Sequence, residues 1–212
     1  IYIFTWSKLK QYLVADEADE DSSNDFGKNI IPAMLNAGEK MSAYRFSGYW
    51  KDVGTINSLW DANMDMLSPD NGIDLYDTEW PIYARSPTKP PHFTGPDAKV
   101  SHSMVTGGCE VWGELANSIL FNSVIVEEGA RVHYSILMPG TVVKKGAVIE
   151  YAIVAENTVI GEDARVGTPP PSSGDEAGDW GIAVVAQNLK VGDGAVVPAN
   201  AMVTRNVKGG AK

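Results

Sequence analysis

The 212-residue sequence predicts a mixed α/β segment followed by a parallel β-helix of hexapeptide repeats. Three observations support this fold class. Helix and strand patterns alternate in residues 1–67, prolines gather between residues 68 and 98, and aliphatic residues recur at every sixth position from Val124 onward. We therefore expect two domains, with the α/β portion and a linker in residues 1–90 and the β-helix in residues 91–212.

The composition is that of a folded globular protein, with 44% hydrophobic and 21% charged residues. The net charge of −10 and the absence of a basic cluster argue against nucleic acid as a partner. No apolar run approaches the ~20 residues that span a bilayer, so no membrane partner is expected. Because Cys109 is the single cysteine and cannot form an internal disulfide, we expect a reducing, cytoplasmic location.

The first elements are a strand and a short helix. Residues 1–4 are an apolar run typical of a buried strand, and because the chain starts there without Met we expect a truncated protein. Thr5 is a candidate cap for a helix over residues 6–14. The acidic run over residues 16–25 is interpreted as a solvated loop rather than a metal site, because nothing fixes its side chains relative to each other.

Two further helices flank a second predicted strand. A helix is expected over residues 25–35, ended by Gly38, and a strand over residues 41–46. Thr55 can cap a third helix that stops before Pro69. Its apolar residues are spaced along one face: Ile56, Leu59, Trp60, Met64 and Leu67. The proline-rich residues 68–98 then form a linker over a surface.

The repeat is the clearest signal in the second half. Its six-residue register contains Val124, Ala130, Ile136, Val142, Val148, Val154, Ile160 and Val166. It breaks at residues 168–174, which we expect to form a surface loop, and resumes at Val185, Val191, Val197 and Val203. Stacked coils bury such residues in a continuous ladder. A buried, unpaired carboxylate is costly, so Val148→Asp is predicted to collapse the stack.

Asp52 is the acid most suggestive of chemistry. It follows the strand predicted over residues 41–46 and precedes a helix cap, a turn where α/β folds place ligands. One or two carboxylates with phosphate oxygens can hold Mg²⁺, but the carboxylate can equally hydrogen-bond turn amides. The nearby aromatic residues Tyr49, Trp50 and Trp60 either stack on a base or sugar or fill core.

The other candidate residues carry weaker signals. His92, His102 and His133 lack metal-ligand spacing and are interpreted as surface or packing residues. Since many hexapeptide-repeat proteins are acyltransferases with a histidine base, His102 or His133 remains an alternative. Cys109 is expected to be a buried, unreactive thiol. The chain has no Gly-rich phosphate loop of a standard type.

Four blocks of sequence together resemble one enzyme family. Residues 25–32, 48–67, 76–82 and 103–109 closely resemble bacterial glucose-1-phosphate adenylyltransferase, also called ADP-glucose pyrophosphorylase. The resemblance runs through essentially the whole chain and corresponds to the C-terminal half of a family member.

The resemblance implies the C-terminal part of a Rossmann-like nucleotidyltransferase domain followed by a left-handed β-helix. It implies an enzyme that forms ADP-glucose and pyrophosphate from ATP and glucose 1-phosphate in glycogen synthesis. By the same resemblance, Asp52 is a catalytic Mg²⁺ ligand, Mg²⁺ is the cofactor, and the protein is a homo-oligomer, a tetramer in the family.

In the family the second metal-binding Asp, the nucleotide loop and the sugar-phosphate residues lie upstream of the part that corresponds to this chain. We therefore expect the 212-residue chain alone to be inactive. Two alternatives are a trimeric acyltransferase and a purely structural or regulatory module. The block over residues 48–67 argues against an acyltransferase, which has no use for a strand, acid and helix turn of this composition.

Overall fold

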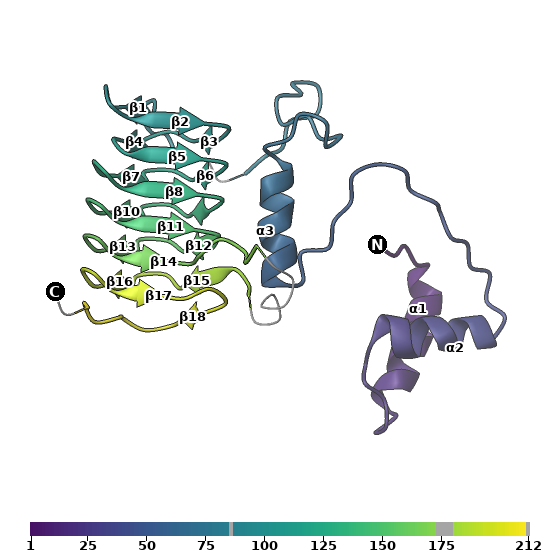
Figure 1. The fold of residues 1–212 in the computed structure, drawn as a ribbon. Coiled ribbons are helices and arrows are strands. Elements are labelled where there is room, and N and C mark those ends of the chain that lie inside the picture. The colour runs from purple at the N-terminus through teal and green to yellow at the C-terminus, as the bar shows by residue number, and fades with distance from the viewer. Residues whose placement is uncertain (85–86, 173–179, 211–212) are drawn as a thin grey trace. The chain divides into compact units, whose positions relative to one another are not determined.

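The computed structural model describes residues 1–84, 87–172 and 180–210. The chain divides into two compact units, Ile1–Ser47 and Gly48–Lys212. Figure 1 shows helices in the first unit, and a stack of short strands with one helix beside it in the second.

The first unit begins with α1, Trp6–Glu17. The predicted helix is confirmed but continues past Val14, so the acidic loop starts later than expected. Thr5 is the N-cap residue by position, yet its side chain makes no capping hydrogen bond. The helix is tied to the segment after α2 by Lys8, whose Nζ lies 2.8 Å from Glu39 Oε1.

The next helical stretch consists of η1, Phe26–Ile30, and α2, Ile31–Asn36. Asp25 caps it, since its Oδ1 accepts hydrogen bonds from the amides of Gly27 and Lys28 at 2.8 Å. Gly38 has a φ of 72°, so the helix ends in the left-handed turn that the sequence predicted.

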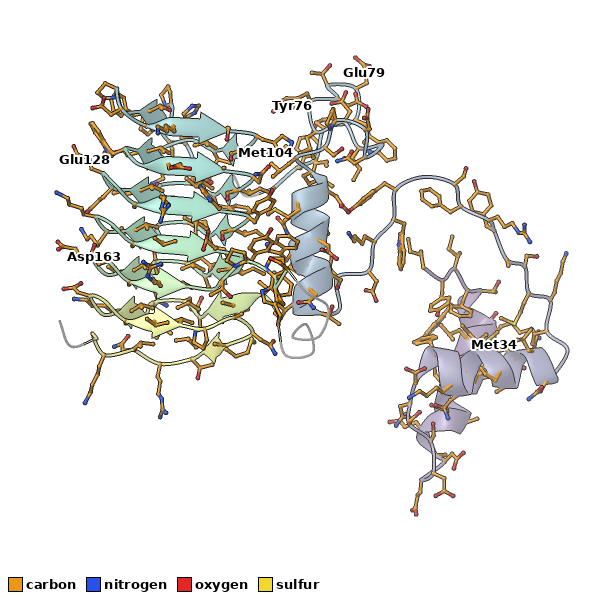
Figure 2. All side chains as sticks on the ribbon, viewed as in Figure 1. Met34, Tyr76, Glu79, Met104, Glu128 and Asp163 are labelled. Atoms are coloured by element: carbon orange, nitrogen blue, oxygen red, sulfur yellow. The ribbon has the colours of Figure 1, made fainter. Side chains whose placement is uncertain are left out.

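The strands predicted over residues 1–4 and 41–46 are not formed. A strand needs a hydrogen-bonded neighbour, and within the described residues neither segment pairs with any other. The core of this unit is correspondingly small: Ile30 and Met34 are its buried hydrophobic residues (Figure 2), whereas Ile3 is 96% exposed.

The second unit contains three parallel sheets of six strands each. The first sheet consists of β1 (Phe93–Thr94), β4 (Glu110–Val111), β7 (Ile125–Val126), β10 (Val142–Val143), β13 (Val159–Ile160) and β16 (Lys190–Val191). The second consists of β2 (Lys99–Ser101), β5 (Glu114–Ala116), β8 (Arg131–His133), β11 (Val148–Glu150), β14 (Arg165–Val166) and β17 (Val196–Val197). The third consists of β3 (Met104–Val105), β6 (Ile119–Leu120), β9 (Ile136–Leu137), β12 (Ala152–Val154), β15 (Ala183–Val185) and β18 (Met202–Val203). Successive strands belong to different sheets, so the predicted β-helix is confirmed.

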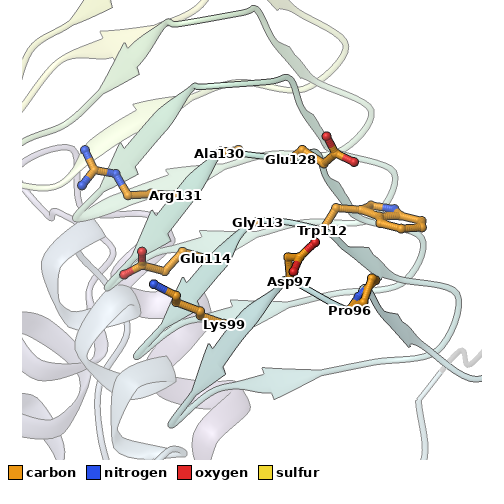
Figure 3. A pocket seen from close by; sticks show the side chains of 10 residues that line it. Pro96, Asp97, Lys99, Trp112, Gly113, Glu114, Glu128, Ala130 and Arg131 are labelled. Carbon is orange, nitrogen blue, oxygen red and sulfur yellow. The ribbon is translucent and has the colours of Figure 1, made fainter.

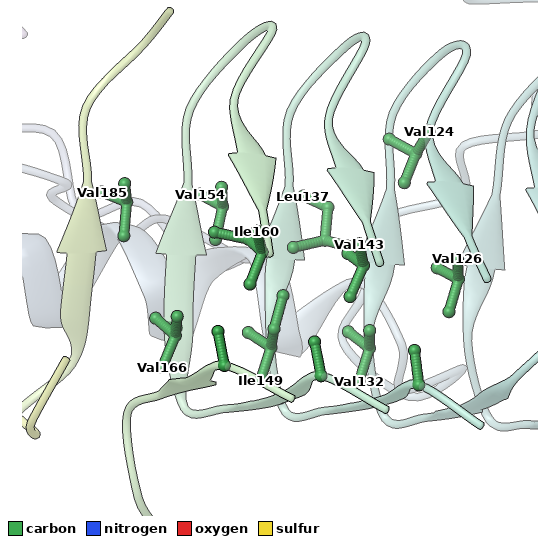
Figure 4. Close-up of a cluster of buried hydrophobic side chains, with 14 of the residues drawn as sticks. Val124, Val126, Val132, Leu137, Val143, Ile149, Val154, Ile160, Val166 and Val185 are labelled. Atoms are coloured by element: carbon green, nitrogen blue, oxygen red, sulfur yellow. The ribbon is translucent and has the colours of Figure 1, made fainter. Parts of the chain in front are cut away.

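The interior ladder follows a register slightly different from the predicted one. Its buried residues in the central coils are Val126, Val132, Leu137, Val143, Ile149, Val154, Ile160 and Val166 (Figure 4). Stacked partners such as Ile125, Val142 and Val159 are 17 residues apart, so one side of each coil has five residues instead of six. Positions predicted with a strict six-residue step therefore shift by one residue per coil relative to the stacked positions of the structure.

Val148 illustrates the slip. Its strand neighbour Ile149 is fully buried in the interior, and successive side chains of a strand face opposite sides. Val148 pairs in register with Arg131 and Arg165, two exposed residues, and so belongs to the outer row. Val148 is nevertheless only 9% exposed, so the effect of Val148→Asp stays a prediction, whereas Ile149 is the residue that fills the interior ladder.

The corners of the coils use left-handed backbone at equivalent positions. The corner between the second and third sheets contains His102, Asn117, Tyr134 and Tyr151, with φ from 42° to 50°. The corner between the first and second contains Gly129, Gly146, Asp163 (Figure 2) and Gly194. Glycine suits such positions because it lacks a Cβ, whereas Tyr is unusual there. Of the loop predicted over residues 168–174, residues 173 and 174 lie outside the described residues.

α3, Ile56–Asp65, packs against the third sheet (Figure 1). Thr55 and Ser58 form a reciprocal capping box, which confirms the predicted start of the helix. The helix face comprises Ile56, Leu59, Trp60 and Met64, and it contacts a cluster around Ile136, Ile153 and Ile182. Leu67, expected in the helix, follows its end. The compact units divide before Gly48, and the domain boundary expected near residue 90 stays a prediction.

Candidate functional site

Asp52 lies in an irregular segment that leads into α3. The carboxylate is exposed, and none of the hydrogen bonds found within the described residues involves it. Its Oδ2 would lie 3.5 Å from a Cβ added to Gly54, so the side chain folds over the turn that precedes the helix cap. Because no turn amide donates to it, this carboxylate is free for a ligand.

Asp65, at the end of α3, joins two residues that precede Asp52. Tyr49 Oη donates to Asp65 Oδ2 at 2.9 Å, and Lys51 Nζ donates to the same oxygen at 2.7 Å. The hydrogen bond from Lys51 is the main cause that lowers the pKa of Asp65, with a further contribution from Tyr49. Asp65 was not among the residues predicted from the sequence, because its role depends on contacts that only the fold creates.

The three aromatic residues near Asp52 have different roles. Tyr49 is bonded to Asp65, and Trp60 packs on the β-helix. Trp60 Nε1 donates to the Tyr134 carbonyl at 2.8 Å, and its ring stacks on Tyr151 with a centroid distance of 5.7 Å. Trp50 is 64% exposed and remains available to stack on a ligand.

Asp52 fits Mg²⁺ as a contributor to a ligand set. Carboxylate oxygens are preferred ligands of this ion, which in phosphoryl-transfer sites is held by one or two carboxylates and substrate phosphates. Within the described ranges no three His, Cys, Asp or Glu residues come together as a metal-binding group.

Two of the three histidines form hydrogen bonds with neighbouring parts of the second unit. His102 is bonded through Nδ1 to Asn117 Oδ1 at 2.7 Å and through Nε2 to the Leu67 carbonyl at 3.0 Å. His133 Nε2 lies 3.0 Å from Glu114 Oε1 on the neighbouring strand. His92 is exposed. These contacts favour the packing interpretation over an acyltransferase base.

Cys109 is buried, as the sequence predicted. Its Sγ donates to the Phe121 carbonyl at 3.0 Å. Burial raises the pKa of this thiol and disfavours the nucleophilic thiolate.

A cavity on the β-helix is lined by charged residues of both signs (Figure 3). Lys99, Glu114 and Arg131 are register partners on neighbouring strands of the second sheet and form one alternating row. Asp97 and Glu128 add negative charge at its edge. Because the opposite charges offset one another, this cavity has no strong preference for an anion or a cation.

In the part of the chain that the structure describes, no helix is both long enough and apolar enough to cross a membrane.

Two family models match different parts of the chain. Residues 1–69 match the nucleotidyl transferase family, and residues 90–185 match a GlmU-like, C-terminal hexapeptide family. The chain therefore joins a nucleotidyl transferase segment to a hexapeptide β-helix. Asp52 and α3 belong to the first by sequence, although α3 packs on the second.

The chain is similar to curated glucose-1-phosphate adenylyltransferases. It is 56% identical over 132 residues to that of Clostridium perfringens (strain 13 / Type A), which is 62% of this chain and 34% of the relative. It is 41% identical over 206 residues to that of Acetivibrio thermocellus, which is 96% of this chain and 48% of the relative. The chain thus spans at most about half the length of these relatives, and the resemblance seen in the sequence is confirmed.

Proposed function

We propose that this chain is part of an enzyme that forms ADP-glucose and pyrophosphate from ATP and glucose 1-phosphate in glycogen synthesis. The observation that carries the proposal is the free, exposed carboxylate of Asp52 within a nucleotidyl transferase segment. The names of the relatives support the choice of substrates.

In this proposal Asp52 is a catalytic residue because it is one ligand of Mg²⁺. When bound, the ion neutralises negative charge on the phosphates that react. α3 supplies a fixed base for the segment that contains Asp52, and Trp50 offers an exposed aromatic face beside it. Alignment of the reactants and neutralisation of charge are the main sources of rate enhancement in phosphoryl transfer.

We further propose that the 212-residue chain alone does not turn over ATP and glucose 1-phosphate. The sequence contains no Gly-rich phosphate loop of a standard type, and among the described residues Asp52 belongs to no group of three or more His, Cys, Asp or Glu residues that could hold a metal ion. An assay for pyrophosphate release by the purified chain tests this. Release above the level of a matched Asp52→Asn sample would contradict it.

A chimera tests the function itself. In the Acetivibrio thermocellus relative, the aligned region would be replaced by this chain, and ADP-glucose formation measured with Mg²⁺ present. We expect an active enzyme in which Asp52→Asn lowers kcat by about 100-fold or more, the scale of losing one electrostatic stabiliser. Asp61→Asn, an exposed acid on α3, is the control with the same change of charge. An active chimera that tolerates Asp52→Asn would refute the role of Asp52.

The partner and location follow from the same assignment. We propose a homo-oligomer, a tetramer as the resemblance implies, in the cytoplasm, where the free thiol of Cys109 is compatible with a reducing environment. Light scattering after size exclusion measures the oligomeric state, and a monomer in the active chimera would contradict the proposed assembly.

A further inference from the structure

We propose that Asp65 is a positioning residue that holds the segment Tyr49–Asp52 against α3 and so keeps the Asp52 carboxylate on the open side of that segment. This inference rests on the proposed function, in which Asp52 binds a divalent cation. It adds a residue whose side chain does not itself reach the cation.

The contacts of the segment alternate along the chain. Tyr49 and Lys51 are half-buried and bonded to the same oxygen of Asp65, at 2.9 and 2.7 Å. Trp50 and Asp52 are exposed. The two bonded residues alternate with the two exposed ones, so the bonds on one side of the segment leave Trp50 and Asp52 on the side of the solvent.

Asp65 is itself fixed by the helix that carries it. α3 is held on the β-helix by its apolar face and by the hydrogen bond from Trp60 to the Tyr134 carbonyl. Its last turn is further closed by Asn71, whose Nδ2 donates to the Asp65 carbonyl at 2.7 Å. A site built on a packed helix is held more accurately than one on a free loop, so the stacked coils serve as the base for Asp52.

The charge of Asp65 has a second consequence. It engages the ammonium group of Lys51, the residue next to Asp52 in the chain. Without Asp65 this ammonium would be released next to the Asp52 carboxylate and would oppose a bound cation. Loss of the Asp65 charge therefore weakens cation binding by two routes, through position and through local charge.

The variants separate these routes. Asp65→Asn keeps the size of the side chain and removes its charge, whereas Asp65→Glu keeps the charge. Lys51→Met and Tyr49→Phe each remove one of the two bonds. Asp61→Asn is the matched control because it removes an exposed charge from the same helix.

The test is NMR of the full chain, with Mn²⁺ alone as the probe. Backbone ¹⁵N relaxation reports the order of residues 49–52, and Mn²⁺-induced broadening of the Asp52 amide reports cation binding. We expect Asp65→Asn to raise the mobility of residues 49–52 and to weaken the broadening by about threefold to tenfold, the range for losing exposed charged contacts. Asp65→Glu should restore part of both signals, and the Trp60 indole signal should not move.

Separate outcomes address the inference and the function on which it rests. If the wild-type Asp52 amide is not broadened by Mn²⁺, the metal role of Asp52 fails, while the relaxation data still judge the positioning role. If Asp65→Asn leaves the order of residues 49–52 unchanged, or if Asp61→Asn disturbs it equally, the positioning role is overturned. Should Asp65→Asn not fold, Lys51→Met and Tyr49→Phe carry the same test.

Discussion

Single positions at the corners show how closely the coils approach one another. A Cβ added to Gly113 would lie far inside the normal contact distance from the Ala130 carbonyl oxygen of the next coil. Gly129 has a φ of 70°, but an added Cβ would meet nothing nearer than 3.8 Å. At the equivalent corner position of a later coil, Asp163 adopts the same left-handed backbone with a φ of 55°. Glycine is therefore favoured at Gly113 because there is no room for a side chain, and at Gly129 because the backbone is left-handed.

We therefore expect Gly113→Ala to destabilise the chain more than Gly129→Ala. The first substitution forces neighbouring coils apart and should cost about 3 kcal/mol. The second adds only the strain of left-handed backbone, about 1 kcal/mol. Urea unfolding followed by circular dichroism measures both free energies. Equal losses would show that the coils are less tightly stacked at Gly113 than this distance requires.

Two substitutions at neighbouring positions of one strand, Ile149→Asp and Val148→Asp, test the register of the interior ladder. Ile149→Asp places an unpaired carboxylate in the interior and should cost at least about 4 kcal/mol, enough to prevent folding of the stack. Val148 is 9% exposed but lies on the outer row beside Arg131 and Arg165, so Val148→Asp should cost less than Ile149→Asp. Thermal unfolding of the two variants checks the register, and the reverse order would contradict it.

At the scale of elements, α3 has two faces with different tasks. The face containing Trp60 packs on the third sheet, and the end containing Asp65 holds the segment before Asp52. One helix thus connects the repeat to the residues that resemble a nucleotidyl transferase.

Trp60→Ala should loosen this connection. The substitution removes the stack on Tyr151 and the hydrogen bond to Tyr134, and we expect a loss of about 3 kcal/mol, at the lower end for a packed aromatic side chain. Trp50→Ala is the matched control because Trp50 is mostly exposed. Tryptophan fluorescence during urea unfolding compares them. An equal effect of the two would contradict the packing of α3.

Many of the helices, turns and strands could be predicted from the sequence. The Thr55 cap, the turn at Gly38 and the β-helix follow from local chemistry and period, which the sequence carries directly. The strands predicted over residues 1–4 and 41–46 do not form, because a strand depends on a partner elsewhere in the chain. The exact register of the interior ladder was not predicted, because a constant six-residue step does not account for the side of each coil that has five residues. The turn and the family resemblance make Asp52 a candidate from sequence alone, whereas Asp65 becomes recognisable only when the fold brings it to Lys51.

At the scale of the whole molecule, sequence family and packing divide the chain at different places. The nucleotidyl transferase match ends at residue 69, yet the second compact unit begins at Gly48. The block over residues 48–67 therefore belongs to one part by sequence and to the other by its contacts.

Cys109 reports on the integrity of the β-helix. Because burial raises the pKa of its thiol, the thiolate fraction at a given pH is lower in the folded chain than in the unfolded one. We expect slow reaction with a thiol reagent at a mildly alkaline pH and fast reaction in urea, with the midpoint matching loss of the β-helix signal. Rapid reaction of the folded chain would contradict the burial of Cys109.

The most direct test of the division at Gly48 is hydrogen exchange of α3 in the full chain and in a chain that starts at Gly48. If α3 is held by the stacked coils, its amides will be equally protected in both chains. If protection of residues 56–65 is lost when residues 1–47 are removed, α3 depends on the first unit, and the stacked coils are not the base that supports Asp52.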